Sequence, residues 1–126
     1  MNLVATVAVG GALGAVGRYV VMSQIGHWLG AGFPWGTLAV NMIGSFAMGI
    51  IVEAGALLWS PSSGLRAMIV VGVLGAFTTF STFSLDVVVL VERGATTAAV
   101  AYIAVSVALS IGALFAGLHL LRMLSG

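Results

Sequence analysis

The sequence predicts an all-α membrane protein with four transmembrane helices, the third of them broken near mid-membrane. Hydrophobic residues make up 61% of the 126 residues and charged residues only 6%, with a mean hydropathy of +1.24. A soluble domain carries about a quarter charged residues, so a soluble fold is excluded. The apolar residues form four runs, each long enough to cross a bilayer as a helix: 3–24, 35–58, 65–91 and 95–122. These spans leave no room for a soluble domain, and residues 1–126 are predicted to form one four-span domain.

The linkers carry residues typical of membrane interfaces. Trp28, Trp35 and Trp59 all fall at predicted span ends, where an aromatic belt is expected. The segments 26–35 and 59–64 hold the chain's two prolines and several glycines, which favour turns. The absence of cysteine excludes disulfides and cysteine metal sites.

The first span is expected to pack closely against a neighbouring helix. Gly10 and Gly14 form a Gly-xxx-Gly pair, and small residues at that spacing let two helices approach. Arg18 lies just inside the end of this span, where it can snorkel to the interface or face a vestibule.

In the second span, small and polar residues share one helix face. Asn41, Ser45 and Gly49 follow at i, i+4 and i+8, with Gly44 beside them. The glycines and Ser45 indicate packing, whereas Asn41 fits either an interhelical hydrogen bond or a place in a pore. Glu53, about one turn from the end of the span, is expected to reach the interface or Arg66.

The third span contains the most informative segment, residues 72–84, which are rich in glycine and hydroxyl groups. About ten apolar residues precede it and about twelve follow, so it falls near the centre of a ~30 Å hydrocarbon layer. Non-helical backbone at that depth is tolerated only in a protein interior or along a watery path, and broken helices at mid-membrane hold ions in transporters. Carbonyl oxygens freed near Gly75 would suit a hard cation. The ring edges of Phe80 and Phe83 carry positive potential that suits an anion.

The fourth span places three hydroxyl groups on one face, from Tyr102, Ser106 and Ser110. Serines in membrane helices often bond only their own i−4 carbonyl. Three aligned hydroxyls, one of them phenolic, equally fit a polar track, and the sequence leaves both interpretations open.

The arginines are nearly balanced across the membrane, and the chain has no lysine. With four spans, Arg66 and Arg122 lie on one side, while Arg93 and, if it reaches the interface, Arg18 lie on the other. Loop Lys/Arg bias sets orientation, so a count of two against two, or two against one, predicts insertion in both orientations unless a weak bias fixes one. Opposite orientations would permit an antiparallel dimer with its axis in the membrane plane.

Three blocks in successive spans carry a family resemblance: GGALGAVGRY at 10–19, GTLAVNMIGSF at 36–46 and GAFTTFSTFS at 75–84. With these blocks in this order, the chain resembles the Fluc-type fluoride channels, also called the CrcB family, over nearly its whole length. The resemblance implies a channel rather than an enzyme. It implies passive export of cytoplasmic fluoride, and hence fluoride resistance, through two pores at the interface of an antiparallel dual-topology homodimer.

The resemblance also assigns roles to residues and partners. It implies a structural sodium ion on the dimer axis, bound by the backbone carbonyls of Gly75 and Thr78, and places Arg18 at a vestibule. The fluoride pore is expected to be lined by Asn41, Phe80, Ser81, Thr82, Phe83, Tyr102, Ser106 and Ser110. The implied partners are fluoride, a second copy of the chain and the lipid bilayer of a prokaryotic inner membrane, without nucleic acid.

Two other functions compete with this interpretation. A small multidrug-type transporter is also a short four-span protein of dual topology, but it needs an embedded carboxylate in the first span, which this chain lacks. A non-transporting structural subunit would explain the glycines, but not the hydroxyl stripe or the third-span segment.

Overall fold

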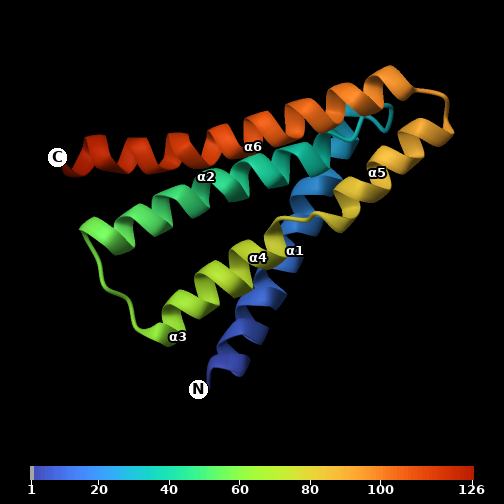
Figure 1. Cartoon of the computed structure of the whole chain (residues 1–126). Helices are drawn as coiled ribbons and strands as arrows, with labels where there is room; N and C mark the ends of the chain where they lie inside the picture. The colour runs from blue at the N-terminus through green and yellow to red at the C-terminus, as the bar shows by residue number, and fades with distance from the viewer. Residues whose placement is uncertain (1) are drawn as a thin grey trace.

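The computed structural model describes residues 2–126, which are all helical apart from short connections (Figure 1). Four helical spans are long and apolar enough to cross a membrane, which confirms the all-α, four-span part of the prediction. Three of them are continuous: α1 (Leu3–Leu29), α2 (Trp35–Leu57) and α6 (Thr96–Ser125). The third span runs through four consecutive segments: α3 (Ser63–Arg66), η1 (Ala67–Leu74), α4 (Gly75–Phe77) and α5 (Ser81–Glu92).

The first helix is longer than the sequence pattern predicts. Asn2 caps it by accepting a hydrogen bond from the Ala5 amide at 2.7 Å. The helix then continues through residues 26–28, which the sequence placed in a linker, and ends at Leu29. Gly30 follows with a φ of 82°, a left-handed conformation that glycine adopts without steric cost, so it stops the helix there.

Two helix pairs make most of the contacts, α1 with η1 and α2 with α6. A Cβ atom on Gly10 or Gly14 would overlap backbone carbonyls of η1, so these glycines allow the first pair to form. Gly49 and Gly117 do the same for the second pair. These contacts confirm the packing role predicted for Gly10, Gly14 and Gly49.

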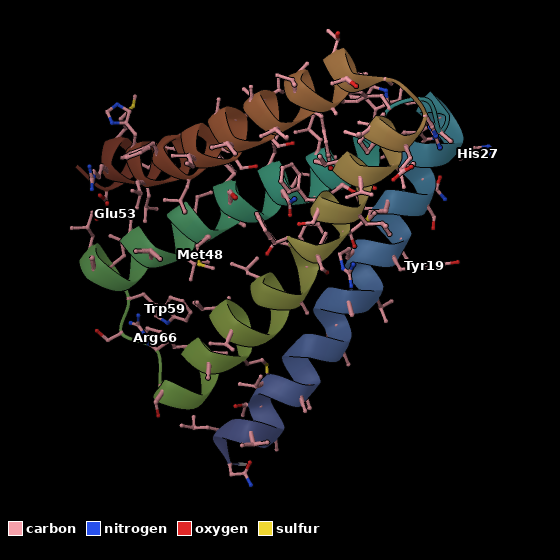
Figure 2. All side chains as sticks on the ribbon, turned by 45° about the vertical axis from the view of Figure 1, so that its right-hand side comes forward. Tyr19, His27, Met48, Glu53, Trp59 and Arg66 are labelled. Atoms are coloured by element: carbon pink, nitrogen blue, oxygen red, sulfur yellow. The ribbon has the colours of Figure 1, made fainter. Side chains whose placement is uncertain are left out.

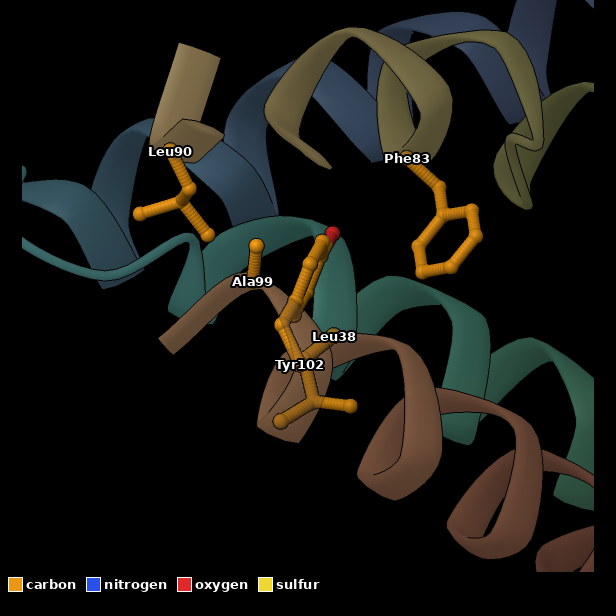
Figure 3. Packing of buried hydrophobic residues seen from close by; sticks show 5 residues of the cluster. All are labelled: Leu38, Phe83, Leu90, Ala99 and Tyr102. Carbon is orange, nitrogen blue, oxygen red and sulfur yellow. The ribbon is translucent and has the colours of Figure 1, made fainter. Parts of the chain in front are cut away.

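The two pairs converge at one end of the molecule and diverge towards the chain termini (Figure 1). At the converging end, α2, α5 and α6 enclose a small core (Figure 3). Its buried members are Leu38, Phe83, Leu90, Ala99 and Tyr102. Tyr102 has no exposed surface, and the ring of Phe33 packs edge-on against it with 5.4 Å between centroids.

At the diverging end, an ion pair joins α2 to α6. Glu53 is buried, and its carboxylate accepts a hydrogen bond from Arg122 Nε. The sequence suggested the interface or Arg66 as its partner. Arg66 instead lies against the end of α2 beside Gly55, near Trp59 (Figure 2). Arg122 follows Glu53 by 69 positions, so only the helix pairing brings them together.

Candidate functional site

The third span changes conformation between Phe77 and Ser81, a stretch called here the 78–80 connection. Thr78 has an extended backbone, with ψ of 159°, so the helix of α4 cannot continue through it. Upstream, η1 is wound as a π-helix, a form that occurs mostly as short irregularities near functional sites. No feature of the apolar sequence 67–74 predicts this wider turn.

Asn41 holds the 78–80 connection from the neighbouring helix α2. Its Oδ1 accepts a hydrogen bond from the Thr79 amide at 2.8 Å, and its Nδ2 donates to the Thr79 carbonyl at 3.0 Å. The side chain therefore replaces helical partners for both backbone groups of Thr79. The interhelical hydrogen bond that the sequence offered as one interpretation of Asn41 is confirmed.

Two carbonyl groups lose their usual helical donors at this point. The Thr79 amide, which would bond the Gly75 carbonyl in an α-helix, donates to Asn41 instead. The Thr82 amide, which would bond the Thr78 carbonyl, donates to Thr79 Oγ1 at 3.2 Å. Both oxygens are thus neutral, hard and available, which is the donor chemistry that a sodium ion requires. Among residues 2–126, no group of three or more His, Asp or Glu side chains could supply an alternative metal site.

A groove of about 370 Å³ lies beside the 78–80 connection, between α2, α5 and α6. No charged side chain lines it, and Met48 projects from α2 towards the third span on its wall (Figure 2). The lining residues are Asn41, Gly44, Ser45, Met48, Thr78, Thr79, Phe80, Phe83, Ser106, Val107, Ser110, Ile111 and Leu114. Five of the eight residues predicted for the pore are therefore brought together here.

Ser106 supplies an unpaired hydroxyl group to this groove. Its side chain is 5% exposed, and its Oγ has no hydrogen-bond partner among the described residues. The i−4 backbone bond considered for the serines of this helix is therefore not made by Ser106. A buried hydroxyl without a partner is costly, which indicates a site that awaits a ligand or water.

The two phenylalanines of the segment differ in exposure. Phe83 is 9% exposed and packs into the core, whereas Phe80 is 77% exposed on the surface of the single chain. Their ring centroids lie 5.4 Å apart with the planes tilted by 43°. The Phe83 ring also packs against the Tyr102 ring, with 5.1 Å between centroids, and this contact fixes the orientation of Phe83.

The remaining predicted residues lie outside the groove. Tyr102 is buried, and its hydroxyl donates to Asp86 Oδ2 at 2.9 Å, so it does not continue the stripe of Ser106 and Ser110 along the groove wall. Ser81 is exposed and Thr82 half-buried at the start of α5. The hydrogen bond between Tyr102 and Asp86 was not predicted from the sequence, although an acid within an apolar span is expected to be paired.

Arg18 lies against the third span. Its Nε donates to the Ala76 carbonyl at 3.1 Å, which joins α1 to the last turn of α4. The side chain is half-buried. A second hollow of about 350 Å³ on α1 is lined by Arg18 and Tyr19 among others.

The fold and this site define a class: a four-span membrane protein with an uncharged polar groove beside a non-helical stretch of its third span. Comparison with known proteins identifies the family. The family model described as CrcB-like protein, Camphor Resistance (CrcB), matches residues 5–118, and the chain belongs to this family.

Three bacterial relatives in this family carry the name fluoride-specific ion channel FluC. The protein of Rhodospirillum centenum is 58% identical over 122 residues, covering 97% of both chains. That of Chelativorans sp. is 58% identical over 116 residues, covering 92% of this chain and 93% of the relative. That of Nitrobacter winogradskyi is 50% identical over 123 residues, covering 98% of each. The relatives are thus named as ion channels and not as enzymes.

Proposed function

We propose that this chain is a fluoride-selective channel that lets cytoplasmic fluoride leave the cell passively. The observation that carries the proposal is the groove beside the 78–80 connection, in which the free hydroxyl of Ser106 faces an uncharged wall. The names of the relatives point to the same ion.

The groove chemistry suits a small, strongly hydrated anion. Conduction requires donors that replace water without creating a deep energy well. Ser106 and Ser110 offer hydroxyl donors, and the edges of Phe80 and Phe83 offer positive partial charge. A lysine or arginine in the wall would hold the anion more tightly. We therefore assign the anion path to this face, and Ser81, Thr82 and Tyr102, which lie outside the groove, remain predicted members of its continuation.

A second copy of the chain completes the pathway in this proposal. The groove wall includes Phe80, a large apolar ring that is mostly exposed in the single chain, and Gly75 in α4 is exposed as well. An antiparallel partner related by an axis through mid-membrane would cover both and form two equivalent pores. The near balance of arginines supports insertion in both orientations.

A sodium ion on that axis is the third part of the proposal. The carbonyls of Gly75 and Thr78, repeated in the partner, would supply four neutral oxygen ligands, and the interrupted third span would lie at mid-membrane. When bound, the ion would neutralise these dipoles and tie the two third spans together. Because carbonyl oxygens repel an anion, the fluoride path is kept on the other side, along Asn41 and the serines.

Fluoride efflux from liposomes tests the proposal against its alternatives. Purified protein in vesicles loaded with potassium fluoride should release fluoride once a potassium ionophore removes the opposing voltage, and equally loaded chloride vesicles should not empty. A multidrug-type transporter would instead exchange cationic drug for protons, and a structural subunit would release neither. Fluoride retention by vesicles shown to contain folded protein would refute the channel.

Dual topology has a separate test in a bacterial inner membrane. Two or three lysines added at one end of the chain should fix one orientation and remove activity, and a partner biased oppositely should restore it on co-expression. The same number of glutamines added at the same end is the control, because they add length without positive charge. Normal conduction by either biased protein alone would show that opposite orientations are not required.

A further inference from the structure

The contact between Arg18 and the Ala76 carbonyl is specific in a way that charge alone does not explain. An interfacial arginine normally extends its head group towards water. Here the Nε atom, which lies within the side chain rather than at its tip, donates to a carbonyl 58 positions away in the sequence. Arg18 also lines the hollow on α1.

The close approach of α1 to the third span places this bond. Gly14 leaves room for the Val73 carbonyl, and Gly17 lies against the ring of Phe77, where an added Cβ would be 3.6 Å from the ring. One residue further along α1, Arg18 reaches the last turn of α4. The arginine is therefore positioned by a packed helix pair and does not depend on a flexible loop.

The bond also removes one oxygen from the carbonyls that are available around the 78–80 connection. Arg18 occupies the Ala76 oxygen, and Asn41 occupies the Thr79 oxygen. The Gly75 and Thr78 oxygens, whose usual donors are diverted, remain available. We propose that Arg18 is a positioning residue for the cation site: its Nε–H group ties the last turn of α4 to α1 and so fixes the direction of the Gly75 and Thr78 carbonyls. This inference rests on the sodium site of the proposed function.

The direction in which sodium affinity changes on replacement of Arg18 distinguishes a positioning role from a purely electrostatic one. A positive guanidinium near a cation site repels the cation, so loss of the charge alone should tighten sodium binding or leave it unchanged. Loss of the hydrogen bond releases α4 and should weaken sodium binding. Fluoride entry behaves differently, because any loss of positive charge near a vestibule lowers the local anion concentration.

Two substitutions remove the charge equally but differ in the donor. In Arg18→Gln the amide Nε2 stands the same number of bonds from the backbone as arginine Nε, so the donor is kept. In Arg18→Met neither charge nor donor remains. Arg93→Met is the matched control, because Arg93 also donates to a loop carbonyl, that of Ala31 at 3.4 Å, but at the far end of α5.

Sodium affinity is read from thermal unfolding of the dimer at constant ionic strength, with sodium replaced stepwise by N-methyl-D-glucamine. We expect Arg18→Met to raise the sodium concentration for half-maximal stabilisation about tenfold, as loss of one charge-assisted hydrogen bond implies. Arg18→Gln and Arg93→Met should stay within twofold of the parent protein. Fluoride efflux at low fluoride should fall equally in the Gln and Met variants.

The outcomes decide between the roles. Equal sodium affinity in Arg18→Gln and Arg18→Met would overturn the positioning role, as would tighter binding in both. Should Arg18→Met yield no folded protein, Arg18→Leu takes its place, because a charge role predicts binding no weaker than in the parent protein and a positioning role predicts weaker binding. If the unfolding temperature of the parent protein does not depend on sodium, the proposed sodium site is refuted, and so is the positioning role of Arg18. Fluoride efflux of the parent protein still judges the channel separately.

Discussion

Replacement of Asn41 by leucine tests whether one side chain maintains the non-helical conformation of the third span. Leucine has a similar branched shape, although it is larger, and it cannot accept from the Thr79 amide or donate to the Thr79 carbonyl. The two bonds, at 2.8 and 3.0 Å, are part-buried and join α2 to the 78–80 connection.

The expected cost follows from the number of bonds lost. Interhelical hydrogen bonds in membrane proteins contribute about 0.6 kcal/mol on average and at most about 1.7 kcal/mol. A backbone N–H left without a partner adds about 1–3 kcal/mol. We therefore expect Asn41→Leu to lower the free energy of unfolding by about 2–4 kcal/mol. Asn41→Asp keeps the acceptor for the Thr79 amide, but it sets a second oxygen against the Thr79 carbonyl and places negative charge in the groove.

Unfolding in mixtures of a mild detergent and dodecyl sulfate, at fixed protein and sodium concentrations, measures this cost. Ser45→Ala is the control, because Ser45 lines the same groove one turn further along α2. It should change the free energy of unfolding by less than about 0.5 kcal/mol. If Asn41→Leu is no less stable than Ser45→Ala, the hydrogen bonds to Thr79 do not maintain the connection. Asn41→Asp should remain folded and lose fluoride efflux.

Two further predictions concern the rings and the glycines. Phe80→Ile and Phe83→Ile keep apolar bulk but remove the positive ring edge, so each should lose most fluoride efflux while the proposed dimer stays intact on a sizing column. Phe115→Ile, at an exposed phenylalanine of α6, is the control and should conduct normally. Wild-type efflux from both Phe80→Ile and Phe83→Ile would leave these phenylalanines as packing. Gly49→Ala should destabilise the fold by about 1–3 kcal/mol because its Cβ would overlap the Leu114 carbonyl. Gly112→Ala, with open space around it, should be neutral or slightly stabilising. Equal free energies of unfolding for the two variants would disprove the close contact of α2 with α6.

The sequence predicted most of the fold because lipid imposes a simple rule. A helix is the only open-chain structure that satisfies its own backbone in hydrocarbon, so four long apolar runs indicate four spans. The ends were harder to place, since α1 continues five residues past its predicted end. Apolar length does not mark a stop, and Gly30 terminates the helix by its backbone conformation.

The site was predicted where residue types determine chemistry and was missed where neighbours decide it. Asn41, Ser106 and Ser110 were selected because polar groups in an apolar helix require a reason, and the fold brings all three to one groove. Tyr102 shares their helix spacing, yet its ring is drawn into the core by Phe33 and Phe83 and its hydroxyl by Asp86. Helical periodicity shows which residues share one face of a helix, but not which residues of other helices contact that face.

The π-helical segment η1 should tolerate substitutions but not changes in its number of residues. Any apolar residue fits the composition of 67–74, so substitutions there should be tolerated where packing volume is kept. Deletion of one residue is different, because each residue turns a helix by about 100°. A single-residue deletion that left the π-helical winding of η1 in place would rotate everything beyond it, and the carbonyls of Gly75 and Thr78 would then face a different neighbour. Length variation among functional descendants of this chain should therefore be confined to its loops.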